Sequence, residues 1–245
     1  MSRNRGSRSL ILAAICLSIA APARSQNPNL PAALSAAQIV DQMQLHNQRR
    51  IAEFRHYHSV RHYRVEYRGF STTIDAEMVV EADYDAVSGK SFRIVSQSGS
   101  KLLCEKVLKR AIDSEKEASQ DKNSTALTPA NYRFQLVGAD NLAGRPAYIL
   151  YVDPITPSKF LYRGRIWVDA ADFAVAKVDA EPSKSPSFWI ARTLIRFTNA
   201  KTGDFWLPEQ TRSETRVRIG GAAVLSIDFG TYQVAPEQSQ PAAGL

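Results

Sequence analysis

All four histidines of the chain lie between residues 46 and 62, and three of them have a spacing that could bind a metal. His56, His58 and His62 are separated by even numbers of residues, so one extended strand would place them on the same face. Neutral imidazoles clustered in this way are ligands for zinc or copper. The same segment is crowded by arginines (Arg55, Arg61 and Arg64), and no nearby Asp or Cys neutralises a cation. We therefore expect no metal and a polar strand face here, and a metal-dependent hydrolase is an alternative hypothesis.

The other patterns that could support catalysis are incomplete. The stretch VSGKS, residues 87–91, ends like a phosphate-binding loop, but Tyr84 stands where the first glycine is required. No G-x-S-x-G stretch is present to hold a nucleophilic serine. The acidic residues of segments 66–83 recur at strand spacing, which is typical of a solvated face. We predict a protein that is not an enzyme and that uses no cofactor.

Alternating residues predict the first strands of a sheet. Tyr63, Val65 and Tyr67 alternate with polar residues, and segment 74–84 repeats the pattern with Met78 and Val80 among its apolar positions. A short strand at 92–95 follows. This period of two is typical of an antiparallel sheet with one solvated face.

Two helices and a long run of strands complete the expected elements. Ser35 is a suitable N-cap for an amphipathic helix that ends near Phe54. A second helix is expected at 101–120, where Cys104 packs as a small apolar residue, and its polar tail DSEKEASQDKNST is expected to be an exposed, mobile connection. Strands then follow at 132–137, 147–152, 160–169, 173–180, 191–198, 207–219 and 222–234.

Such a long meander must bend to protect its edges. We predict an α+β fold in which a strongly curved antiparallel sheet forms a half-open, incomplete β-barrel with helices on its concave face. A β-sandwich is the competing arrangement.

The inward-facing apolar residues either fill this barrel or line a ligand cavity. The candidate cavity residues are Tyr63, Val65, Met78, Val80, Phe134, Tyr148, Leu150, Trp167, Phe173, Val175, Leu225 and Ile227. Arg163 and Arg165 flank Gly164, where they could contact an anionic headgroup at the cavity mouth or cover the outside of a strand.

The first 25 residues predict export. Arg3, Arg5 and Arg8 precede an apolar run at 10–21, and small residues follow it, as in a cleavable signal peptide. We predict a signal peptide at 1–25, a flexible leader at 26–34, one domain at 35–234, a disordered tail at 235–245 and no transmembrane segment in the mature chain. Removing residues 1–25 takes away four arginines and no acid, so the formal charge falls from +7 to about +3. That charge and an exported location argue against a nucleic-acid partner.

Two stretches of the second half of the chain resemble a known protein family. The first is YRGRIWVDAADFAVAKVDAEP, residues 162–182, and the second runs from FWIARTLIRF through GDFWLPEQ to GTYQV, residues 188–234. Together with the signal peptide and the helix–strands–helix–strands order, they resemble the LolA/LolB-like superfamily. This group includes outer-membrane lipoprotein-sorting proteins and the lipid-binding domain of RseB-type regulators.

The resemblance implies a half-open barrel that accepts acyl chains, with 35–54 as a packing helix and 101–120 as part of a lid. It also implies an arginine on an early strand that latches the lid, for which Arg61, Arg64 and Arg68 are candidates. We accordingly expect a periplasmic, non-enzymatic protein that carries or senses a lipid or acylated lipoprotein and that contacts an inner- or outer-membrane envelope protein. The alternative is a structural or regulatory envelope module whose core is filled.

Overall fold

A computed structural model describes residues 34–69, 71–120, 122–185, 188, 190–218 and 220–235, and the expected signal peptide and most of the expected tail lie outside them. Its helical segments are α1 (Ala36–Glu53), α2 (Lys101–Leu103), the π-helix η1 (Cys104–Leu108), α3 (Lys109–Gln120) and α4 (Lys122–Thr125). The strands are β1 (His56–Arg68), β2 (Thr73–Asp85), β3 (Gly89–Gly99), β4 (Tyr132–Leu142), β5 (Arg145–Pro154), β6 (Tyr162–Asp169), β7 (Val175–Pro182), β8 (Ile190–Thr202), β9 (Phe205–Val217), β10 (Ala222–Asp228) and β11 (Tyr232–Ala235).

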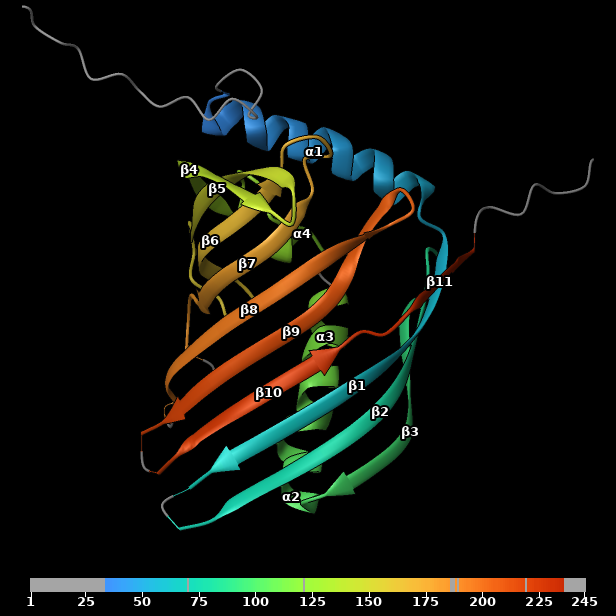
Figure 1. Cartoon of the computed structure of the whole chain (residues 1–245), viewed down its shortest axis with the longest axis vertical. Coiled ribbons are helices and arrows are strands. Elements are labelled where there is room, and N and C mark those ends of the chain that lie inside the picture. Colours follow the sequence, from blue (N-terminus) through green and yellow to red (C-terminus); the bar gives the residue numbers. More distant parts are fainter. Residues whose placement is uncertain are drawn as a thin grey trace, which may run out of the picture.

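All of these strands belong to one curved antiparallel sheet. Its order is β3-β2-β1-β10-β9-β8-β7-β6-β5-β4, with β11 added beside β1, so β3 and β4 are its two edges. Figure 1 shows the sheet curling around the α2–α3 segment, with α1 crossing one end. The predicted half-open barrel with helices on its concave face is confirmed.

Two hydrophobic clusters hold the helices against the inner face of the sheet. The first joins α1, through Ile39, Val40 and Met43, to the inward residues of β4–β7. The second joins Leu103, Leu108 and Ile112 to β1, β2 and β10. Cys104 is buried in this second cluster, as predicted.

The helix predicted from Ser35 to Phe54 is confirmed, including its ends. The Ser35 hydroxyl accepts from the Gln38 N–H while the Gln38 side chain accepts from the Ser35 N–H, which is a capping box. Ile39, Val40 and Met43 recur at helical spacing on one face, and that face is buried.

The second helix predicted at 101–120 is confirmed, because α2, η1 and α3 together cover Lys101–Gln120. Its polar tail is helical to Gln120 and mostly exposed, as expected, and α4 follows at Lys122–Thr125. The polar side chains themselves fix this segment, because Glu115 pairs with Arg61 and Lys90 while Glu117 pairs with Lys159.

Several predicted strand limits change for local reasons. The predicted strand at 92–95 extends over the whole of β3. The strand predicted from Phe173 starts at Val175, because Phe173 has a φ of 50° and belongs to the β6–β7 turn. The single strand predicted at 222–234 divides into β10 and β11. Gly230 makes this break with a φ of +57°, and a Cβ there would lie 2.3 Å from the Val60 carbonyl oxygen.

Candidate functional site

The inner face of the sheet can be followed across nine strands. Directly paired residues point to the same side, and one row runs through Ala76, Val65, Leu225, Ser213, Ile195, Ala180, Gly164, Val152 and Phe134. Val65 and Val152 are fully buried near the two ends of this row, whereas Ser213 and Ile195 in its middle are half-buried. The inner face is therefore covered at both ends and partly open between them.

This half-buried middle is called the central strip below. It consists of inward-facing Thr193, Ile195 and Phe197 from β8, Thr211, Ser213 and Thr215 from β9, and Ala223 and Leu225 from β10. The Thr193 and Thr215 hydroxyls lie 3.1 Å apart. Phe197 packs on the first cluster and Leu225 on the second, so the strip joins the two cores.

Arg61 of β1 anchors α3 to the inner face. Its side chain is 1% exposed, and its Nη1 donates to Glu115 Oε2 of α3 at 2.9 Å. Lys90 of β3 donates to the other carboxylate oxygen at 2.8 Å, and Arg61 Nη2 donates to the Tyr57 hydroxyl at 3.2 Å. The guanidinium also lies 4.8 Å from the ring centre of Phe229. One carboxylate of the helix is thus held by two cations of the sheet.

The charges of this cluster stabilise one another. Burial disfavours the charge of Arg61, but Glu115, Tyr57 and Tyr63 together outweigh burial and raise the pKa of the guanidinium above its ordinary value. Burial likewise opposes the Glu115 charge, but Lys90 and Arg61 lower the pKa of this carboxyl below its ordinary value. We infer that Arg61 and Glu115 are both charged when α3 is docked.

Beneath α3 the structure leaves several buried polar atoms unsatisfied. Among the described residues, Ser59 Oγ, Arg61 Nε and Tyr232 OH have no hydrogen-bond partner. Burial raises the pKa of the Tyr63 and Tyr232 hydroxyls. Unpaired buried polar groups cost free energy, so this region is less tightly held than an apolar core of the same size.

The sequence-predicted cavity residues fall into two separate groups. The second cluster contains Tyr63, Val65, Met78, Val80, Leu225 and Ile227. The first contains Phe134, Tyr148, Leu150, Phe173 and Val175. The central strip connects the groups, and most of its residues are polar or small, which is why apolar pattern alone did not identify it.

Trp167 does not share the inner face. It pairs directly with Ile149 and Lys177, whereas Ile166 beside it belongs to the inner row of the first cluster. Its indole N–H donates to Asp140 Oδ2 at 2.9 Å, and the Lys177 ammonium lies 4.3 Å from its ring centre. The expectation that Trp167 lines the interior is therefore wrong.

Four of the candidate arginines, all except Arg61, also lie on the outer face. Arg163 and Arg165 alternate with inward Gly164, so they cover the outside of β6, and Arg163 pairs with Asp153 at 3.0 Å. The headgroup contact considered for them inside a cavity mouth is excluded by this orientation. Arg64 points outward from β1 and pairs with Glu77, whereas Arg61 points inward to α3. Arg68 is exposed beside Glu66.

The three histidines share the outer face of β1, as their spacing predicted. His58 Nδ1 lies 2.8 Å from Asp83 Oδ1 on β2, a neighbour 25 residues away that sequence spacing missed. His56 and His62 are exposed. Within the described part of the chain, no group of three metal-ligating side chains comes together.

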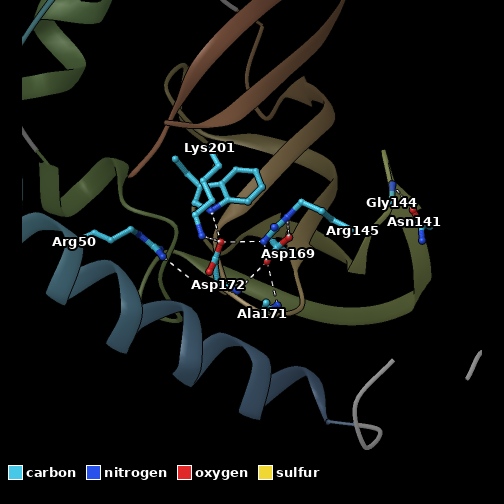
Figure 2. Close-up of polar contacts among 9 residues, drawn as sticks. Arg50, Asn141, Gly144, Arg145, Asp169, Ala171, Asp172 and Lys201 are labelled. Atoms are coloured by element: carbon cyan, nitrogen blue, oxygen red, sulfur yellow. Dashed lines mark hydrogen bonds and ion pairs between the residues drawn. The ribbon is translucent and has the colours of Figure 1, made fainter. Parts of the chain in front are cut away.

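A second polar centre lies at the β6–β7 turn and ties α1 to the sheet (Figure 2). Asp169 is 2% exposed and accepts from Arg145 Nε at 2.6 Å and Nη2 at 2.8 Å. Asp172 Oδ2 accepts from Arg145, Lys201 and the Trp206 indole N–H at 3.0, 2.8 and 2.9 Å. The backbone carbonyl of Asp172 accepts from Arg50 Nη1 of α1 at 2.9 Å. This centre was not predicted from the sequence.

Comparisons with known proteins give similarities of fold. No family model matches the chain, and no curated protein matches its sequence. Similar solved structures include a DUF1329 family protein from Desulfovibrio piger, with 13% identity and a TM-score of 0.45 over 87% of this chain and 95% of that one. A putative outer membrane lipoprotein-sorting protein domain from Vibrio parahaemolyticus has 10% identity and a TM-score of 0.44 over 85% and 95%.

A LolA superfamily protein from Nitrosomonas europaea has 12% identity and a TM-score of 0.37 over 83% of this chain and 94% of that one. Among the described residues, no helix has both the length and the apolar character needed to span a membrane. The open, curved antiparallel sheet with helices on its concave face is the architecture that the sequence resemblance implied.

Proposed function

We propose that the mature chain is a periplasmic binding protein, a single domain over residues 35–234 that follows a cleaved signal peptide. It holds the acyl chain of a lipid or acylated lipoprotein against the inner face of its sheet, and α3 acts as a movable cover. The role is one of binding and release rather than catalysis. It agrees with the export signal expected from the sequence and with the resemblance to lipoprotein-sorting proteins.

The observation that carries this proposal is the way α3 is attached. Within α3 only Ile112 is buried, with Ala111 packed beside it, and the helix is otherwise attached by the ion pairs of Glu115 and Glu117 and by the Lys116 ammonium over the Phe92 ring. A helix fixed by charges over an apolar floor can be displaced at a lower free-energy cost than one fixed by a continuous apolar stripe. The π-helix η1 lies directly before α3, a type of irregularity that often accompanies functional sites.

Displacement of α3 would expose an apolar floor of the right chemistry. Tyr63, Val65 and Met78 lie beneath Leu108 and Ile112 in the second cluster. An acyl chain that replaces these two helix side chains and extends along the central strip would gain roughly 0.8 kcal/mol for each buried methylene. About ten methylenes would therefore supply on the order of 8 kcal/mol, enough to offset the loss of one buried ion pair.

The test is a titration of the mature protein with a fluorescent C16 fatty acid. Ser213→Trp places a bulky side chain on the inner face of β9, and Arg212→Trp places the same side chain on the outer face one residue away. We expect Ser213→Trp to weaken binding at least roughly tenfold and Arg212→Trp to change it little, while both proteins stay folded. Equal affinities for the two variants would refute binding on the inner face.

A second candidate function is an interaction module that meets envelope proteins at the sheet edges. The edge strands β3 and β4 expose apolar side chains, namely Ile94 and Val95 on the first and Leu136 and Val137 on the second. Unpaired edges are templates for an added strand. Loss of partner binding in Val95→Lys and Val137→Lys, with fatty-acid binding unchanged, would favour this function, whereas unaltered partner binding would exclude these edges.

A further inference from the structure

Arg50 is a half-buried cation that has no carboxylate partner among the described residues. Its Nη1 donates to a backbone carbonyl, that of Asp172, and no described acid lies within ion-pair distance of it. Burial lowers the pKa of this guanidinium below its ordinary value, and Asp172 offsets the effect only in part. The remaining guanidinium N–H groups are therefore available to an anion, which would remove part of this electrostatic cost.

A cavity lies beside this guanidinium, between α1, the segment before β4 and the β6–β7 turn. We call it the α1 pocket, and its volume is about 250 Å³. Met43, Leu127 and Phe173 supply apolar surface, and Gln44, Asn47 and Arg50 of α1 supply polar groups. This volume is just below the roughly 300–1,000 Å³ typical of pockets for drug-sized ligands, so the occupant is small.

The charges around the α1 pocket favour an anion. The carboxylates of Asp169 and Asp172 already bind Arg145 and Lys201, so neither neutralises Arg50 (Figure 2). His46 lies one helical turn before Arg50 with its ring 5.3 Å from that of Phe173. The pKa of His46 is lowered by burial and by the charges of Arg50 and Arg49, against a smaller opposite effect of Asp172. The local potential is therefore positive.

The polar rim is suited to a carboxylate in particular. Gln44 uses its amide N–H to hold the Leu127 carbonyl at 3.0 Å, and Asn199 uses its own to hold the Val175 carbonyl at 2.7 Å. The described residues give Asn47 no hydrogen-bond partner, so its amide can donate to a ligand beside Arg50. A planar guanidinium binds a carboxylate with two parallel hydrogen bonds.

We propose that the α1 pocket binds a small monocarboxylate with an apolar body, whose carboxylate contacts Arg50 and whose body lies against Met43 and Phe173. This site lies on α1, apart from α3 and its ion pairs, and goes beyond the proposed function. Two kinds of ligand carry a carboxylate next to an apolar group: a free aromatic acid and the C-terminal residue of a peptide. A ligand of this size is too short to test the acyl site, so the two proposals can fail independently.

The experiment is a titration of the mature protein with benzoate. Calorimetry measures the affinity, and the NMR signal of the indole N–H of Trp206, a residue that lines the pocket, reports binding at this site. Benzyl alcohol tests the need for charge, and inorganic phosphate tests the need for an apolar body. N-acetylphenylalanine represents a peptide C-terminus. Binding of benzoate that shifts the Trp206 signal and exceeds that of benzyl alcohol and phosphate by at least roughly tenfold supports the site.

The variants separate Arg50 from a general effect of positive charge. Arg50→Gln is expected to weaken benzoate binding at least roughly tenfold, Arg50→Lys less, and Arg49→Gln, the same charge loss on an exposed neighbour, by less than about twofold. Tighter binding of N-acetylphenylalanine than of benzoate supports the site as one for peptide C-termini, and the reverse supports free acids. Equal loss in Arg49→Gln, equal binding of benzyl alcohol, or no benzoate binding to the wild-type protein would overturn the proposal.

Discussion

Arg61 Nη1 lies 2.9 Å from Glu115 Oε2 although the two residues are 54 positions apart in the chain. The contact joins the buried Arg61 side chain of β1 to α3, a helix in which only Ile112 is buried. Because the Glu115 carboxylate also binds Lys90 of β3, the position of α3 depends on charges that the sheet supplies.

Replacing Arg61 by leucine should destabilise the protein far more than replacing its outward neighbour Arg64. Arg61→Leu leaves Glu115 with a single partner in a partly desolvated site, so we expect a loss of about 2–3 kcal/mol in the free energy of unfolding. Arg64 is exposed and its pair with Glu77 is solvated, so Arg64→Leu should cost less than about 1 kcal/mol. Urea denaturation of both variants measures the difference, and equal losses would contradict an anchoring role for Arg61.

Stability should fall at acidic pH, and Glu115 should account for part of the fall. The folded protein holds the pKa of Glu115 below its ordinary value of 4.5. The stabilisation is therefore fully present above that value and is lost as the pH falls through the lower, folded-state pKa. In Glu115→Gln the unfolding free energy should decline less steeply below about pH 5 than in the wild-type protein. Identical slopes in the two proteins would show that Glu115 titrates alike in the folded and unfolded states.

Asp169 depends on Arg145 at the β6–β7 turn. Arg145→Ala would leave the 2% exposed Asp169 carboxylate without its bidentate cation, so we expect a loss of about 3 kcal/mol in unfolding free energy. Arg133→Ala is the matched control, because Arg133 is exposed and its pair with Asp153 spans 4.0 Å, and it should cost less than about 1 kcal/mol. Thermal and urea unfolding measure the loss of unfolding free energy in the two variants. A loss in Arg145→Ala no larger than that in Arg133→Ala would show that the Arg145–Asp169 pair does not stabilise the β6–β7 turn.

Gly230 should tolerate no side chain. Its φ of +57° and the 2.3 Å approach to the Val60 carbonyl oxygen mean that Gly230→Ala must move β1 or β11, at a cost of roughly 3 kcal/mol or more. Gly89 has a φ of +83° with open space around the added methyl, so Gly89→Ala should cost only the backbone strain of roughly 1 kcal/mol. If the two alanine variants unfold at the same urea concentration, the close approach at Gly230 is not what separates β10 from β11.

The residues themselves predict the fold because its main elements follow local periodicity. The period of two on β1 and β2 places Tyr63, Val65, Met78 and Val80 inside, and the helical period places Ile39 and Met43 on the buried face of α1. These patterns need only neighbours in the chain.

Long-range pairings could not be predicted in the same way. No local pattern connects Glu115 to Arg61 or Asp172 to Lys201, because each pair depends on how the sheet curves. Trp167 was misplaced because residues 166–169 are all buried, so burial gives no alternation from which to read the face. Apart from Leu225, the central strip was missed because its threonine and serine hydroxyls resemble those of a solvated strand.

Native mass spectrometry of the protein, purified without detergent, tests the central claim most directly. If the inner face holds an acyl ligand, the spectrum should contain added mass that disappears on organic extraction and returns with added phospholipid or fatty acid, and Ser213→Trp should carry less of it than Arg212→Trp. A bare protein mass that does not change with either lipid would contradict the account and favour a filled core.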